Sequence, residues 1–255
     1  MTRRHLAFTC EDDRLVGTLD EASGSSGLLF VTGGNETRSG AFSGQAHLAA
    51  RIAAVGHPVF RFDRRGVGDS EGDNLGFRES GPDIAAALAA FRAAHPALER
   101  IVGFGNCDAA SALMLAGGSG CDALVLANPW TFESDDEWTM SPAAIRSRYA
   151  EKLRNPREVM RLVRGNVSPG KLVRGLKQAM LPAPPPSTLL KDMRAGMASF
   201  GGEVHYLVAG RDRTGLAFAE SWDGEVKTLP DADHAFSSPH ASEWLYNRLL
   251  ATLDK

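Results

Sequence analysis

The pattern of apolar and polar residues along the chain predicts strands and helices in alternation. Two short segments, near residues 4–9 and 14–19, flank Asp12 and Asp13 and predict an antiparallel hairpin. Beyond residue 20 the apolar runs are separated by longer helical patterns, which is typical of parallel strands joined by helices. The strands expected in this mainly parallel sheet are residues 27–32, 58–62, 101–104, 123–127 and 204–209.

Helical periodicity fills the intervals between these strands. The second helix is predicted to be capped by Ser80, with Pro82 just inside its first turn. The third is apolar and is predicted to stop at Gly117 and Gly118. The predicted fold class is therefore α/β, a mainly parallel twisted sheet flanked by helices. The helices expected are residues 45–56, 80–95, 109–116 and 242–253.

One connection is much longer than the others. More than 70 residues separate the strand at 123–127 from the strand at 204–209, whereas most connections in compact domains have a few. We therefore expect a helical cap, residues 130–200, inserted before the last predicted strand. The cap would divide the core into residues 1–129 and 201–255.

The predicted cap carries a strong positive charge. Residues 146–177 contain ten Lys and Arg against two Asp and Glu, in a chain of formal net charge −3. A solvated helical face explains this charge as well as the functional alternatives do. Those alternatives are a lid that attracts an anionic substrate, such as a phosphate-bearing or carrier-linked acyl compound, and a surface that contacts anionic lipid. Nucleic-acid binding is disfavoured because stacking aromatics are not interleaved with the charges. Under the lid hypothesis the substrate-binding candidates are Arg154, Arg157 and Arg161.

Length and composition fit one enzyme-sized domain in a reducing compartment. The chain has 255 residues, 43% of them hydrophobic, which is enough for one buried α/β core with a modest insertion. Its three cysteines argue against a disulfide framework and for the cytosol. The N-terminus lacks a signal-peptide core, and no stretch has the 18–20 apolar residues of a membrane span. A cytoplasmic location is therefore expected.

The sequence contains no cluster spaced for metal ligands and no glycine motif of the Walker or dinucleotide-binding type. We therefore expect neither a metal nor a cofactor.

The segment Gly105-Asn106-Cys107-Asp108-Ala109 has the form of a nucleophile elbow, with cysteine where serine is usual. Small residues two positions before and after the nucleophile allow a very tight strand-to-helix turn. A thiol at the following helix N-terminus lies at the positive end of the helix dipole, which favours the thiolate. A buried, purely structural cysteine is the alternative interpretation of the motif by itself.

A base and an orienting acid follow the elbow in the order that this motif requires. Asp212 lies in the loop after the strand at 204–209, and His234 lies in a loop before the last helix. His240 competes for the role of base but falls six residues late. Asp233 is the next candidate for the acid.

Together these motifs resemble the α/β-hydrolase superfamily over nearly the whole chain. Its turn motif after the second core strand is present as V-F-R-F-D-R-R-G-V-G-D-S-E-G, residues 59–72, and most of these residues are expected to be structural. The resemblance implies an α/β-hydrolase fold. It also implies an oxyanion hole formed by the loop at Gly34 and Asn35 and by the backbone N–H of Asp108.

The cysteine in place of serine resembles the Cys-His-Asp arrangement of dienelactone hydrolases, although the flanking residues differ. More narrowly, G-G-N-E-T-R-S-G, D-R-R-G-V-G-D-S-E-G and G-N-C-D-A-A-S-A look like the hydrolases associated with the exosortase A system. That resemblance implies a hydrolase in the exopolysaccharide and protein-sorting metabolism of Gram-negative bacteria. It names no substrate.

The expected function is hydrolysis of an ester or thioester of a small acyl compound. Cys107 is the expected nucleophile, His234 the base and Asp212 the orienting acid. The same residues would also serve an acyltransferase, and a binding protein that has lost turnover is a third hypothesis. The acyl group, the leaving group and the oligomeric state are left open.

Overall fold

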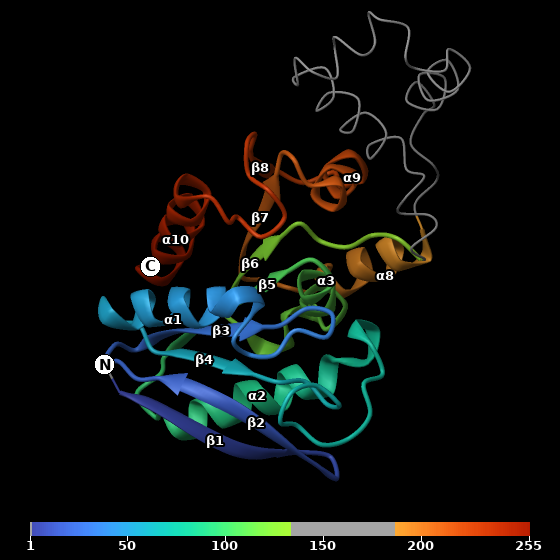
Figure 1. The fold of residues 1–255 in the computed structure, drawn as a ribbon. Coiled ribbons are helices and arrows are strands. Elements are labelled where there is room, and N and C mark those ends of the chain that lie inside the picture. The colour runs from blue at the N-terminus through green and yellow to red at the C-terminus, as the bar shows by residue number, and fades with distance from the viewer. Residues whose placement is uncertain (1, 134–186) are drawn as a thin grey trace, which may run out of the picture.

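An eight-stranded sheet runs through the part of the chain that the computed structural model describes, residues 2–133 and 187–255 (Figure 1). The spatial order is β1-β2-β4-β3-β5-β6-β7-β8. Strands β1, β2 and β4 pair antiparallel, and every later pair is parallel. The strands are β1 Arg3–Cys10, β2 Asp13–Asp20, β3 Ser26–Val31, β4 Val59–Phe62, β5 Arg100–Asn106, β6 Ala123–Ala127, β7 Glu203–Ala209 and β8 Val226–Leu229.

These pairings confirm the predicted hairpin and each of the five predicted core strands. The hairpin closes where Cys10 pairs with Asp13. Strand β8 was not predicted. It has four residues, of which only Leu229 is buried, so its apolar signal is weak.

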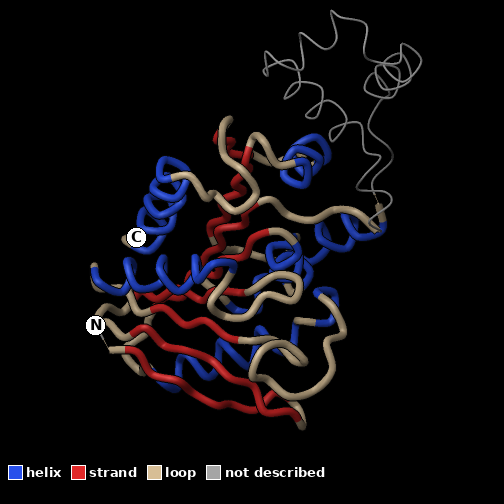
Figure 2. The backbone as a smooth tube through the Cα atoms, in the orientation of Figure 1, coloured by secondary structure: helices blue, strands red, loops and turns tan. Residues whose placement is uncertain are grey.

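Helices cover both faces of the sheet, as Figure 2 shows. Helices α1 and α10 bury their apolar sides against one face, and α2, α3, α8 and α9 bury theirs against the other. The parallel strands in the middle are therefore apolar on both faces, which is what a doubly covered sheet requires. The helices are α1 Gly44–Ala54, α2 Gly81–Ala94, α3 Asp108–Leu115, α8 Thr188–Met197, α9 Arg213–Ser221 and α10 Pro239–Leu253.

The start of α2 corrects one detail of the sequence analysis. Ser80 does stand at the N-cap position with Pro82 in the first turn, but its side chain does not cap the helix. The Ser80 hydroxyl donates to the carbonyl of Gly76 and accepts a hydrogen bond from Arg64 Nη1 at 2.8 Å. The predicted cap was wrong because a buried guanidinium, distant in sequence from the helix, uses the hydroxyl instead.

The predicted cap segment falls mostly on residues 134–186, which lie outside the described residues, together with Arg154, Arg157 and Arg161. Its C-terminal end includes α8, which buries Leu189 and Met193 in the same apolar cluster as α3. The proposed domain boundaries therefore stay a prediction. None of the helices described is both long and apolar enough to span a bilayer.

Candidate active site

Cys107 lies at the tight turn between β5 and α3. Its backbone has φ 63° and ψ −128°, a conformation that costs a non-glycine residue of order 1–3 kcal/mol. A Cβ atom at Gly105 would lie 2.7 Å from backbone atoms of Ala109 and Ala110, so a larger residue there would force the turn open. The elbow predicted from the spacing of small residues is therefore present, and it is held in a strained conformation.

Asp212 follows β7 and begins α9. Its Oδ2 accepts a hydrogen bond from the backbone N–H of Gly215 at 2.9 Å, which fixes the carboxylate as the N-cap of the helix. The same oxygen lies 3.1 Å from Nδ1 of His234. Asp212 is buried, and the His234 side chain is 45% exposed. The loop before α10 thus brings His234 to the acid that the sequence predicted for it.

The imidazole of His234 also meets the thiol of the elbow. Hydrogen bonds with Asp212 and with Cys107 raise the pKa of His234 from 6.5 to about 10, against the lowering effect of burial. At neutral pH this histidine is therefore charged. The carboxylate, the imidazolium and the sulfur form one connected chain of polar contacts, and the sulfur stands at a helix N-terminus.

The two competing candidates lie elsewhere. Asp233 uses its carboxylate within its own loop, where it accepts hydrogen bonds from the backbone N–H and the hydroxyl of Ser237. His240 lies in the first turn of α10. Neither Asp233 nor His240 takes part in the ion pair that Asp212 forms with Nδ1 of His234.

A pair of asparagines that sequence reasoning missed holds the His234 loop in place. The side-chain amides of Asn106 and Asn128 donate to the backbone carbonyl of His234 at 3.1 Å and 3.2 Å. Asn128 also donates to Asn106 Oδ1 and accepts from the backbone N–H of Ala209, and it is fully buried with φ 43°. The sequence signal that could have identified Asn128 was its position as a polar residue directly after the apolar strand β6, at the sheet edge where sites form.

The loop after β3 brings Gly34 to the elbow. The backbone N–H of Gly34 donates to both carboxylate oxygens of Asp108, at 2.9 Å and 2.8 Å. A Cβ atom at Gly33 would lie 2.4 Å from Asp108 Oδ1, so a larger residue there would displace the carboxylate from this contact. The neighbouring Asn35 accepts a hydrogen bond from Asn74 at 2.8 Å. The amide expected to face an oxyanion is thus engaged by a carboxylate, a contact that the sequence did not predict.

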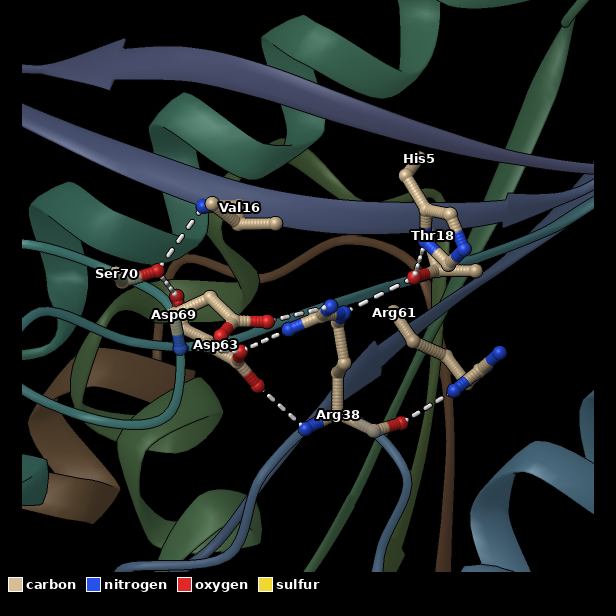
Figure 3. A network of polar contacts seen from close by, with 8 residues as sticks. All are labelled: His5, Val16, Thr18, Arg38, Arg61, Asp63, Asp69 and Ser70. Carbon is tan, nitrogen blue, oxygen red and sulfur yellow. Dashed lines mark hydrogen bonds and ion pairs between the residues drawn. The ribbon is translucent and has the colours of Figure 1, made fainter.

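Arg38 anchors the far end of this loop (Figure 3). Its backbone N–H and its guanidinium both donate to Asp63, and Nη2 donates to Asp69 at 2.8 Å. Its carbonyl accepts a hydrogen bond from the buried Arg61, and its Nε donates to Thr18. The acidic residues of the turn motif after β4 therefore act structurally, as expected, by holding the loop that carries Gly34.

An arginine of the turn motif itself also contacts the loop. Arg64 is 2% exposed and donates from Nη2 to the carbonyl of Gly34. The same nitrogen is 3.9 Å from Asp108 Oδ2. Burial lowers the pKa of Arg64, and the negative charges of Asp108 and Asp83 oppose that shift. The site therefore contains a buried cation as well as the predicted amide donor.

Within residues 2–133 and 187–255, no group of three or more His, Cys, Asp or Glu side chains is arranged to hold a metal ion.

Comparisons with known proteins agree with this architecture. A family model described as the alpha/beta hydrolase family matches residues 28–246. No curated protein matches the chain. Among solved structures, the esterase Pf2001 of Pyrococcus furiosus has a TM-score of 0.65 at 16% identity, covering 99% of this chain and 90% of that one.

Two further structures are similar over almost their full length. A putative hydrolase from Agrobacterium vitis S4 has a TM-score of 0.59 at 18% identity, covering 99% of this chain and 98% of that one. Est1E from Butyrivibrio proteoclasticus, solved with ferulic acid, has a TM-score of 0.59 at 13% identity, covering 98% and 100%. At these identities the structural similarity supports the fold.

Proposed function

The chain belongs to the alpha/beta hydrolase family, and from this we propose that it hydrolyses an ester or thioester through Cys107, His234 and Asp212. The observation that carries the proposal is the continuous contact from Asp212 through His234 to a cysteine at a strained elbow. A purely structural cysteine needs neither a charged histidine beside it nor a buried acid behind that histidine. Esterases among the structural neighbours are consistent with this chemistry.

In the first half-reaction, His234 takes, or already holds, the thiol proton of Cys107, and the sulfur attacks the acyl carbon while the carbonyl electron pair moves onto oxygen. The intermediate collapses to a thioester on Cys107, and His234 gives its proton to the departing alkoxide or thiolate. In the second half-reaction, His234 removes a proton from water as the water attacks the thioester. The second tetrahedral intermediate breaks its bond to sulfur and releases the carboxylic acid, and His234 returns a proton to the sulfur of Cys107, with Asp212 holding the imidazole tautomer throughout.

The backbone N–H groups of Gly34 and Asp108, with Asn35 shaping the loop, are proposed to bind the oxyanion. Each such donor contributes about 10²- to 10³-fold in rate where it has been removed experimentally in other enzymes. The turn motif supports this geometry because its Asp63 accepts from Arg38 at one end of the loop and its Arg64 donates to the carbonyl of Gly34 at the other.

Intact-mass spectrometry after mixing with a panel of acyl thioesters and activated esters tests the proposal. We expect an acyl adduct on the wild type that decays to free acid, and none on Cys107→Ala. Cys10→Ala is the matched control, because it removes a cysteine buried at the β1–β2 hairpin, and it should acylate like the wild type. Asp212→Asn should fold and turn over up to about 10⁴-fold more slowly if the acid mainly holds the tautomer.

The same experiment separates the alternatives. An adduct that persists in water and decays only when a hydroxyl or amine acceptor is added would identify an acyltransferase. Binding of acyl compounds without any covalent adduct on Cys107 would contradict the proposal and leave a binding protein on this fold.

We propose further that the substrate is anionic or carrier-linked and belongs to exopolysaccharide or exosortase-linked metabolism. The support is the sequence resemblance and the basic segment that contains Arg154, Arg157 and Arg161. Replacing these three residues with Glu should weaken the binding of an anionic substrate and leave the binding of a neutral ester unchanged. For the wild type, kcat/KM of that substrate should fall as salt rises, because the Debye length shrinks from about 10 Å at 0.1 M to about 3 Å at 1 M. Equal salt dependence for a neutral ester would contradict the lid hypothesis.

A further inference from the structure

The side chain of Asp108 takes the backbone N–H that is expected to bind an acyl oxyanion. Its two oxygens share the backbone N–H of Gly34, the donor expected for the oxyanion. Asp108 is also the first residue of α3, so its carboxylate lies at the positive end of that helix. Its side chain is 17% exposed and Gly34 is exposed, so solvent can reach this contact and another anion could replace the carboxylate there. A carboxylate oxygen and an oxyanion have the same charge and the same need for donors.

Arg64 adds a fixed positive charge to this position. Its guanidinium is buried, and its contacts with Gly34 and Ser80 are to neutral acceptors. Among the described residues, Asp108 is the carboxylate within 4 Å of this guanidinium, at 3.9 Å, and the nearby Asp83 forms its direct ion pair with Arg65. A buried cation that loses its counter-charge is strongly destabilising. If the carboxylate leaves, another anion is favoured in its place.

We propose that the Asp108 carboxylate is a displaceable internal occupant of the oxyanion hole, and that Arg64 stabilises first this carboxylate and then the substrate oxyanion. The proposal rests on the acyl chemistry proposed above. A substrate carbonyl is neutral in the ground state and becomes negative only as the sulfur adds. Arg64 therefore favours the transition state over the bound substrate.

The carboxylate also competes with the substrate. The carbonyl oxygen reaches the N–H of Gly34 only after the Asp108 side chain has turned away from it. The competition should reduce apparent affinity for an oxyanion mimic by about 10- to 100-fold, the equivalent of one charge-assisted hydrogen bond. Glycine at position 33 leaves room for the carboxylate, because a Cβ atom there would lie 2.4 Å from Asp108 Oδ1.

Acetate is the probe for this exchange, because it is a carboxylate that can replace the one removed. In Asp108→Ala, acetate should raise the melting temperature and inhibit hydrolysis of a neutral activated ester competitively, at concentrations at least tenfold below those needed for the wild type. Asp108→Asn removes the charge while keeping the side-chain size, and it should show the same gain to a smaller degree. Asp223→Ala is the matched control: it removes an exposed aspartate that pairs with Arg194, and it should respond to acetate like the wild type.

The opposing interpretation is that Asp108 is only a tether between α3 and the Gly34 loop. In that case both Asp108 variants lose stability and activity, and acetate restores neither beyond its effect on Asp223→Ala. That result would overturn the proposal. The acetate-dependent melting temperature needs no turnover and can also be measured in a Cys107→Ala background. Failure of the acyl chemistry and failure of this inference are therefore distinguishable.

Discussion

Selective alkylation of Cys107 in the native protein is the prediction that most directly tests the elbow. The perturbation is a limiting amount of iodoacetamide at pH 8, a reagent that reacts with the thiolate form of cysteine. The chain has three cysteines, Cys10, Cys107 and Cys121, and all are free thiols. Cys107 is the one partly exposed, at a helix N-terminus and in hydrogen-bond contact with a charged histidine.

The expected selectivity follows from the two buried thiols. Burial, with the Asp83 charge second, raises the pKa of Cys10 from 9.0 to about 11. Burial, with the Asp122 charge second, raises the pKa of Cys121 from 9.0 to about 12. At pH 8 their thiolate fractions are about 10⁻³ and 10⁻⁴, against about 10⁻¹ for a thiol of pKa 9.0. They should react about 100-fold and 1,000-fold more slowly than such a thiol, before their 3% and 6% exposure slows them further.

Time-resolved peptide mapping by mass spectrometry measures the three rates. Cys107 should be modified at least 100-fold faster than the other two in the native protein. In guanidinium the three should react within a few-fold of one another, because unfolding removes both burial and the histidine. His234→Ala should slow only Cys107. Labelling of Cys10 or Cys121 first, or equal native rates, would refute the reasoning.

Three further predictions concern the framework of the site. Gly105→Ala should destabilise the protein by about 1–3 kcal/mol in urea unfolding and slow Cys107 labelling, because its Cβ would meet backbone at 2.7 Å; a wild-type labelling rate would contradict this. Asp20→Asn should cost about 3–5 kcal/mol, because it leaves the guanidinium of Arg61 buried without its carboxylate; a loss below about 1 kcal/mol would count against it. The raised pKa of His234 should stabilise the wild type over His234→Ala fully below pH 6.5, and the difference should shrink as pH rises towards about 10; a difference that grows with pH would show the opposite sign.

Much of the site could be predicted because the features that define it involve residues close together in the sequence. The elbow is specified by small residues at fixed offsets from Cys107, and the strand before it and the helix after it have their own apolar patterns. Asp212 and His234 each follow a recognisable strand or precede a recognisable helix. Since parallel strands end at one edge of the sheet, residues placed after them converge without further information.

The residues that the sequence left unassigned or assigned wrongly are those whose roles depend on distant partners. Ser80 has the position of a helix cap, yet Arg64, 16 residues earlier, takes its hydroxyl. Asn128 holds the backbone of His234 across 106 residues, and no local pattern encodes that contact.

The sequence by itself determined the hairpin, the five core strands, the helices α1, α2, α3 and α10, the elbow and the three side chains that meet there, because periodicity and steric size act between near neighbours. Only the tertiary structure decided what surrounds them. The N–H of Gly34 faces the carboxylate of Asp108, 74 residues away, and the buried charge of Arg64 lies beneath both. Such contacts form because buried charged groups need partners, and the fold decides which residues, distant in sequence, lie close enough to supply them.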